Sequence, residues 1–103
     1  FPQSQYSGAQ VFCNAAGKEL AGALQASLIG TLDPNSHRSV KSGKGIYLLE
    51  KANCPAVLVE CGFLSNEAEE AKLRSADHQK KLCCCIAATV TEFLTRREST
   101  DIM

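Results

Sequence analysis

The feature that most constrains the fold is a continuous apolar run, Ala56–Val59, that leads directly into Glu60 and then into Cys61-Gly62. An uninterrupted apolar run with two valines predicts a strand covered on both faces, because a half-exposed strand would alternate with polar residues. Strands of this kind belong to parallel or mixed sheets with helices on both sides. The run therefore favours an α/β fold.

The residues before this run predict a strand and a long helix. Gly8–Cys13 alternates between two faces, which is typical of a half-buried strand. Ala15–Leu32 repeats leucine every four residues and places Gln25 on the opposite, polar side. This pattern predicts an amphipathic helix that begins after an Asn14 N-cap and ends at the turn residues 33–35.

Two shorter segments follow the helix. Ser36–Gly45 is polar and rich in basic side chains, so we expect an exposed loop. Ile46–Leu49 is a short β-prone run and predicts a second strand.

The last third of the chain predicts two helices. Asn66 and Glu69 have the spacing of a capping box, which opens a helix through Leu73. Asp77 is a candidate cap for a second helix over His78–Arg97. Two or three strands would make an unusually thin sheet. We therefore expect the C-terminal part of a three-layer α/β domain, with a mixed, largely parallel sheet flanked by helices.

Composition excludes several classes of protein. The chain has 103 residues, with eleven Lys and Arg against eleven Asp and Glu, so no net charge attracts it to nucleic acid. Its most apolar window, Leu82–Thr91, is shorter than the roughly 20 residues that span a bilayer. The chain starts at Phe1 and shows no signal peptide, which favours an excerpt of a longer or processed chain.

The six cysteines do not have the spacing of a metal site or a disulfide framework. Cys83, Cys84 and Cys85 are consecutive and diverge around a helix, and Cys54 and Cys61 lie too far apart for a zinc knuckle. We expect mostly packed thiols, including Cys13 and either Cys83 or Cys85. A small redox or metal protein is therefore disfavoured.

Glu60 is the strongest candidate for chemistry. Ligands of open α/β sheets bind outside the carboxyl ends of strands, where a carboxylate can act as a base. The alternative is that Glu60 caps the following turn or pairs with Arg38 or Lys41. His37 and His78 have no ligand spacing and are expected to be solvated, and no motif predicts a nucleophile.

Three stretches together resemble one known family. The run Pro55–Asn66, with the sequence PAVLVECGFLSN, resembles the C-terminal signature of the zinc-dependent N-acetylmuramoyl-L-alanine amidases of the amidase-3 family. Ser7–Phe12 and His37–Leu49 resemble the family segments that precede this signature. The opening residues 1–8 are most similar to the spore germination amidases of the CwlD type.

The resemblance implies a hydrolase that cleaves the amide between N-acetylmuramic acid and L-alanine through a zinc-activated water. It implies that Glu60 is the catalytic base and that Arg38 and Lys41 face the peptidoglycan substrate. The family's zinc ligands match positions upstream of Phe1, so residues 1–103 would be the C-terminal portion of one catalytic domain. We expect this segment to bind no catalytic zinc and to be inactive alone.

The resemblance also implies an extracytoplasmic location in the cell wall or spore cortex. The expected partners are peptidoglycan and a regulatory protein, and an open sheet edge predicts self-association. The alternative function is a non-catalytic or degenerate amidase fragment that binds peptidoglycan or a partner protein without turnover.

Overall fold

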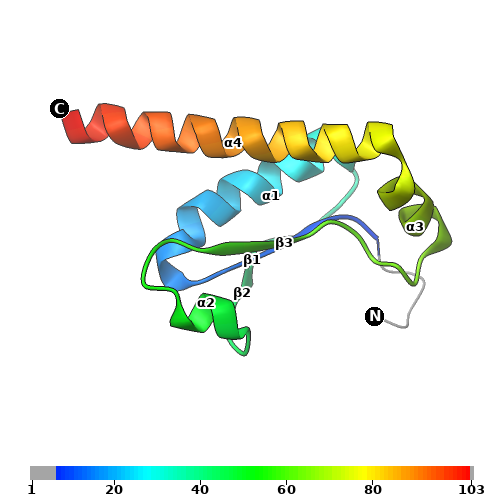
Figure 1. Ribbon diagram of the computed structural model, residues 1–103, viewed down its shortest axis with the longest axis horizontal. Helices are drawn as coiled ribbons and strands as arrows, with labels where there is room; N and C mark the ends of the chain where they lie inside the picture. The colour runs from blue at the N-terminus through cyan, green and yellow to red at the C-terminus, as the bar shows by residue number, and fades with distance from the viewer. Residues whose placement is uncertain (1–6, 103) are drawn as a thin grey trace.

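The structure is a computed structural model that describes the backbone of residues 7–102 and the side chains of residues 7–97. It has one three-stranded sheet, two long helices and two short ones (Figure 1). In chain order the elements are β1 (Gln10–Cys13), the 3-10 helix η1 (Ala15–Gly17), α1 (Lys18–Leu32), β2 (Lys41–Ser42), α2 (Tyr47–Lys51), β3 (Val57–Glu60), α3 (Glu67–Arg74) and α4 (Ala76–Ile102).

The sheet has the order β2-β1-β3 and is mixed. β1 pairs in parallel with β2 and antiparallel with β3. The mixed α/β class predicted from the sequence is confirmed. The apolar run is not covered on both faces, however, because β3 is an outer strand of the described sheet and Leu58 keeps 39% of its surface exposed. Only alternate residues of β3, Val57 and Val59, pack against the core.

The predictions for residues 36–49 were wrong in two places. The basic loop contains β2, which extends the sheet where Gly43 N donates to Cys13 O at 2.7 Å. The β-prone run is instead the start of α2, in which Glu50 N donates to Ile46 O. Gly45 turns the chain with φ of +87°, and its N–H donates to the Glu50 carboxylate, so local hydrogen bonds override β propensity.

The hydrophobic core lies on one face of the sheet, where α1 and α4 pack side by side (Figure 1). α2 lies on the other side of the sheet in this view. The leucine repeat of α1 supplies Leu24 and Leu28 to this core, as predicted, and α4 supplies Leu82. The buried members of this cluster are Val11, Cys13, Ala21, Leu24, Leu28 and Leu82.

Gln25 does not lie on the polar side of α1, as the sequence pattern predicted. It is buried, and its amide takes the place of a neighbouring strand beside β1. Val11 N donates to Gln25 Oε1 at 2.8 Å, and Gln25 Nε2 donates to Ala9 O at 3.0 Å. β2 pairs with β1 only from Phe12 onward, so this amide supplies the partners that a longer β2 would have supplied.

The capping predictions were confirmed in part. Asn14 accepts from Gly17 N, and Asn66 accepts from the N–H groups of Ala68 and Glu69. The cap of the last helix is not Asp77 but Ser75, whose hydroxyl accepts from the N–H of residue 78. α4 therefore begins earlier than predicted.

In the part of the chain that the structure describes, no helix combines the length and the apolar character needed to cross a bilayer.

Candidate functional site

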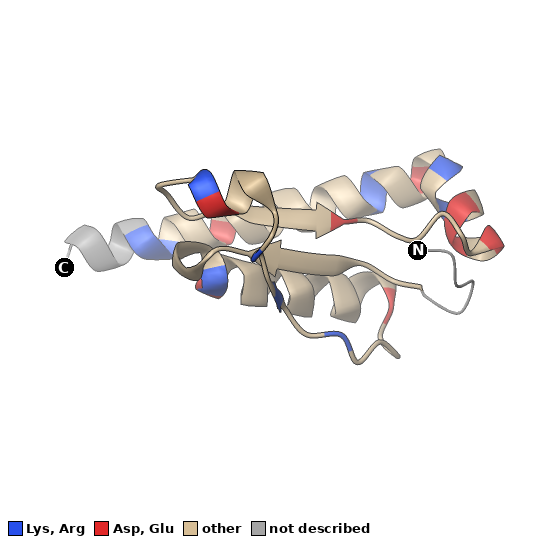
Figure 2. Ribbon diagram, turned by 90° about the horizontal axis from the view of Figure 1, so that it is seen from below, with Lys and Arg blue, Asp and Glu red and all other residues tan. Residues whose placement is uncertain are grey.

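The candidate site lies on the sheet face opposite α1 and α4. Glu60 ends β3 and stands beside Gln10 of β1 in the antiparallel register. Phe12 and Leu58 form the next row, and Lys41 of β2 continues it on the other side of Phe12. Residues paired in register share a face. Figure 2 shows that charged residues are absent from β1 and β3 except at the end of β3.

Glu60 has a carboxylate that is free of internal partners. Its side chain is partly buried, and it forms no hydrogen bond or ion pair with residues 7–97. The alternatives in which Glu60 caps the following turn or pairs with Arg38 or Lys41 are therefore wrong for this structure. A carboxylate in this setting can accept a proton from a bound water molecule.

Arg38 is held firmly beside this face by three contacts. Its Nε donates to Ser7 O at 3.0 Å, and its Nη1 donates to Gln10 Oε1 at 3.1 Å. Its guanidinium also stacks over the ring of Phe63, 4.7 Å from the centroid. Arg38 thus connects the start of β1 to the loop that follows Glu60. Sequence reasoning missed both Gln10 and Phe63 as parts of this arrangement.

Gln10 is almost fully buried, with 1% of its surface exposed. Besides accepting from Arg38, its amide nitrogen donates to Ser39 O at 2.8 Å. The amide is therefore fixed in orientation beside Glu60. No local pattern predicts this burial, because the partners of Gln10 lie 28 and 29 residues away.

Arg38 and Lys41 border an open groove of about 550 Å³. His37, Ser36 and Asp33 also line it. Lys41 and His37 are exposed, as expected of solvated side chains. The groove combines the two cationic side chains of Arg38 and Lys41 with one carboxylate, so it can accept an anionic ligand in an oriented way.

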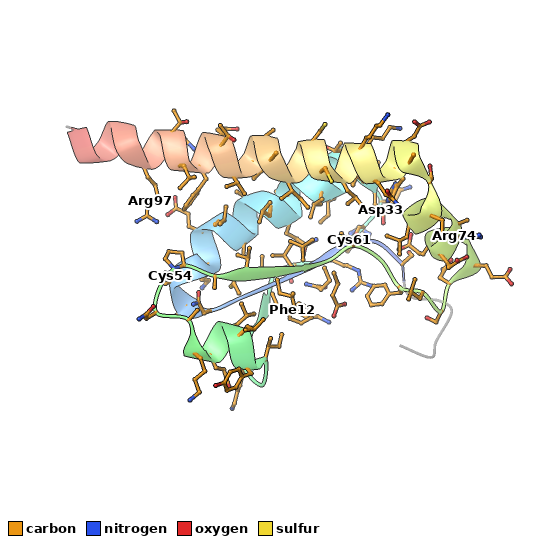
Figure 3. The ribbon with its side chains drawn as sticks, in the orientation of Figure 1. Phe12, Asp33, Cys54, Cys61, Arg74 and Arg97 are labelled. Atoms are coloured by element: carbon orange, nitrogen blue, oxygen red, sulfur yellow. The ribbon has the colours of Figure 1, made fainter. Side chains whose placement is uncertain are left out.

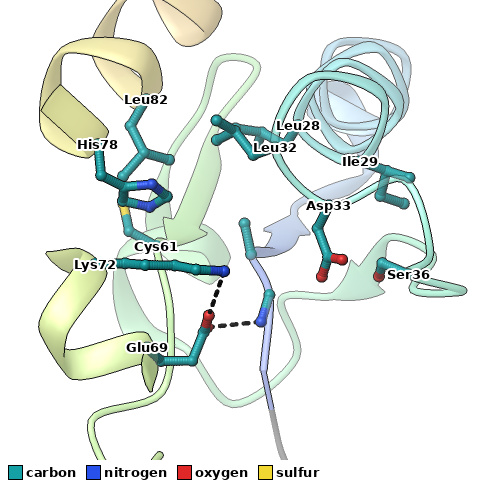
Figure 4. A pocket seen from close by; sticks show the side chains of 12 residues that line it. Leu28, Ile29, Leu32, Asp33, Ser36, Cys61, Glu69, Lys72, His78 and Leu82 are labelled. Atoms are coloured by element: carbon teal, nitrogen blue, oxygen red, sulfur yellow. Dashed lines mark hydrogen bonds and ion pairs between the residues drawn. The ribbon is translucent and has the colours of Figure 1, made fainter. Parts of the chain in front are cut away.

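Glu69 has a role that its capping-box position did not predict. Its carboxylate is buried, at 6% exposure, and accepts from Gly8 N at 2.7 Å, while Lys72 Nζ lies 3.8 Å away. Figure 4 shows this contact at the edge of a small cavity between α1, α3 and α4. The bond ties α3 to the start of β1. No local signal could reveal it, since the two residues are 61 positions apart.

The expectation of mostly packed thiols is wrong, because four of the six cysteines are exposed: Cys54, Cys61, Cys83 and Cys84. The two thiols singled out as packed are placed as predicted. Cys13 is buried, and of the two candidates in α4 it is Cys85 that packs against the core, while Cys83 is exposed. Cys61 lines the cavity of Figure 4 together with His78 and Leu82. Burial raises the pKa of the Cys61 thiol, and the charge of Cys83 raises it further.

Among the described residues, no three His, Cys, Asp or Glu side chains come close enough together to hold a metal ion. His37 lies in an exposed loop, and His78 lies near the start of α4, where it lines the cavity.

Comparisons with known proteins agree on one family. Residues 1–92 match the amidase-3 family model, described as N-acetylmuramoyl-L-alanine amidase. The germination-specific N-acetylmuramoyl-L-alanine amidase of Bacillus subtilis (strain 168) is 32% identical over an alignment of 99 residues, and the match covers 93% of this chain and 41% of that protein.

Solved structures show the same likeness. The CwlD amidase of Clostridioides difficile, solved in complex with the GerS lipoprotein, is 40% identical with a TM-score of 0.87. The match covers 92% of this chain and 50% of that one. The amidase AmiC2 of Nostoc punctiforme is 22% identical with a TM-score of 0.82 over 90% of this chain and 51% of that one, which shows the shared fold.

This chain therefore spans only about 41–51% of the length of these relatives. Within that span the family model, the identity to the germination-specific relative and the fold shared with the CwlD amidase agree. The chain belongs to the amidase-3 family of N-acetylmuramoyl-L-alanine amidases and is of the CwlD type.

Proposed function

We propose that this chain contributes the base-bearing part of a peptidoglycan amidase that hydrolyses the amide between N-acetylmuramic acid and L-alanine. The observation that carries this proposal is Glu60, whose carboxylate stands at the carboxyl end of β3, on the sheet face opposite α1 and α4, without a partner among the described residues. Such strand ends are where open α/β sheets bind ligands. Family membership and the names of the relatives support the reaction class.

In this proposal Glu60 is the general base. It takes a proton from the water that attacks the amide carbonyl, and the proton then passes to the nitrogen of L-alanine as the C–N bond breaks. The neighbouring Gln10 amide, fixed by Arg38, keeps the carboxylate beside a rigid surface. A base of this kind contributes about 10²–10⁴ in rate.

The family resemblance implies that zinc supplies the activated water, but the residues of this chain do not fit a catalytic zinc site. Such a site needs three protein ligands, and the described residues bring no three candidate donors together. We therefore assign no step of the reaction to zinc within this chain. The proposal places the zinc ligands outside these 103 residues, which alone bind no catalytic zinc and hydrolyse no peptidoglycan.

Arg38 and Lys41 are proposed to face the anionic stem peptide of peptidoglycan. Both border the groove next to the face that carries Glu60. Arg38 donates from Nε and Nη1 to internal acceptors, so its Nη2 is the nitrogen that remains to bind a ligand. Lys41 is exposed, and its ammonium group can bind a carboxylate without losing an internal bond.

A chimera tests the role of Glu60 directly. In it this chain replaces the matching half of the Clostridioides difficile amidase, to which it is 40% identical. We expect Glu60→Gln to lower the release of muropeptide products by about 10²–10⁴. Glu19→Gln, at an exposed position of α1, is the matched control and should leave the rate unchanged. A Glu60→Gln chimera with nearly full activity would refute the assignment.

The second candidate is a module that binds peptidoglycan or a partner protein without turnover. The observation that favours it is the lack of a metal site among the described residues. The Clostridioides difficile relative was solved with a lipoprotein, which makes a protein partner a reasonable proposal for this chain as well. Cosedimentation of the 103-residue chain with purified sacculi, together with an inactive chimera, would favour this function. Either function would place the chain outside the cytoplasm, at the cell wall or spore cortex.

A further inference from the structure

The end of β3 directs one cysteine toward α4. Val57 and Val59 face the core, and Cys61 continues this alternation one residue beyond the strand. Cys61 also lines the cavity between the helices together with His78 and Leu82, both of which belong to α4 (Figure 4). The Cys61 side chain therefore lies next to the first turns of α4.

One side of α4 packs against the same core as Val57 and Val59, and α4 runs in the opposite direction to β3. Cys83, Ile86 and Val90 are spaced by three and four residues, so they share one side of the helix. Ile86 and Val90 pack against the core, as Val57 and Val59 do. Figure 1 shows that α4 runs opposite to β3. The side of α4 that carries Ile86 and Val90 thus brings Cys83 to the end of the sheet at which Cys61 lies.

The electrostatics of Cys61 agree with this placement. Burial is the first cause of its raised pKa, and the charge of the Cys83 thiolate is the second. A thiolate has this effect only when it is close by. Both side chains are also exposed enough for a small reagent to reach them.

We propose that Cys61 and Cys83 form a redox-sensitive pair, and that their disulfide joins the end of β3 to α4. The oxidant is a low-molecular-weight disulfide such as glutathione disulfide. The Cys83 thiolate attacks one sulfur of this reagent and releases one glutathione; the Cys61 thiolate then displaces the second glutathione from the mixed disulfide. Two protein thiols are oxidised, one glutathione disulfide is reduced to two glutathione thiols, and the two thiol protons pass to the released glutathiolates.

This inference does not depend on the proposed amidase reaction. Its structural consequence is local: the disulfide would fix the residue that directly follows Glu60 to a long helix. The other exposed cysteines serve as controls. Cys84 points about 100° away from Cys83 around α4, and Cys54 lies at the opposite end of β3 from Cys61 (Figure 3).

The test maps disulfides in the 103-residue chain after oxidation with glutathione disulfide and alkylation of the remaining thiols. Trypsin releases Cys61 within residues 52–72 and Cys83 within residues 82–96, which also contain other cysteines. The mapping therefore uses a background in which only Cys13, Cys61 and Cys83 remain: Cys54→Ser, Cys84→Ser and Cys85→Ala. We expect the two peptides to be joined in the monomer, and dithiothreitol to separate them.

The matched control keeps Cys13, Cys54 and Cys84 instead, through Cys61→Ser, Cys83→Ser and Cys85→Ala. It should form no internal disulfide between the same two peptides. The wild-type chain provides a check that needs no variant, because it should lose two of its six free thiols as a monomer. Equal cross-linking in the control, or separate glutathione adducts on Cys61 and Cys83 without a joined product, would overturn the proposal.

Discussion

Replacing Gln25 with leucine tests whether a buried amide completes the edge of β1. Gln25→Leu keeps the side-chain size but removes the acceptor of Val11 N and the donor to Ala9 O. Val11 is fully buried, so its N–H would lose its partner without gaining water, at a cost of about 1–3 kcal/mol. Ala9 is only partly buried, so water can replace part of its lost bond.

The leucine side chain buries more apolar surface than glutamine, which offsets about 1 kcal/mol of this loss. We therefore expect the free energy of unfolding to fall by about 1–3 kcal/mol. For a domain of this size each kcal/mol lowers the melting temperature by about 4–8 °C. Urea unfolding followed by far-UV circular dichroism measures the change.

Gln79→Leu is the matched control, because Gln79 is exposed and its side chain makes one bond, from Nε2 to Leu73 O. Its loss should stay below about 1 kcal/mol. A Gln25→Leu chain as stable as the wild type, or one that loses no more than the Gln79 control, would show that the amide is not needed to complete the sheet edge.

Two further predictions follow from backbone and thiol chemistry. Gly8→Ala should destabilise the chain by about 1–2 kcal/mol, because Gly8 has φ of +85° and a Cβ there would lie 2.7 Å from Asp33 Oδ2. Gly22→Ala, in open space on α1, should instead stabilise it by about 0.5–1 kcal/mol. Changes of the same sign in the free energy of unfolding, measured with urea, would contradict this account. The folded state raises the pKa of Cys61, so it holds the thiol proton more tightly than the unfolded chain does. The free energy of unfolding should therefore fall as the pH rises above about 8.5. Cys61→Ser should remove part of this fall between about pH 8 and pH 10, and identical stability profiles for the variant and the wild type would refute this reasoning.

Local patterns predicted most of the elements correctly. The leucine repeat of α1 and the Asn66 cap of α3 depend on residues three or four apart, so their signals lie within one segment. For α2 the prediction failed because local hydrogen bonds outweighed β propensity, whereas in two other places a distant partner decided the outcome. Gln25 is buried because β1 offers unpaired backbone groups, and residues 41–42 form β2 because β1 lies beside them.

The apolar run 56–59 predicted a strand correctly, but its predicted burial on both faces was wrong for a related reason. A continuous apolar sequence indicates burial on both faces only if something covers the second face. In this chain α1 and α4 cover one face, and Leu58 remains exposed on the other. Glu60 lies on the same face as Leu58, opposite α1 and α4, so the misassigned burial and the candidate site are two aspects of one feature.

The candidate site shows why a motif identifies a residue more readily than it predicts the residue's surroundings. The signature pointed to Glu60, but its neighbours come from the start of β1, from Arg38 and from Phe63. Strand pairing brings Gln10 beside Glu60, and Arg38 joins the other segments to them by bonding to Ser7 O and Gln10 while stacking on Phe63. A lysine at position 38 would keep the charge but could not make the forked bonds and the flat stack together. The arrangement around Glu60 therefore depends on the shape of the guanidinium group as well as on its charge.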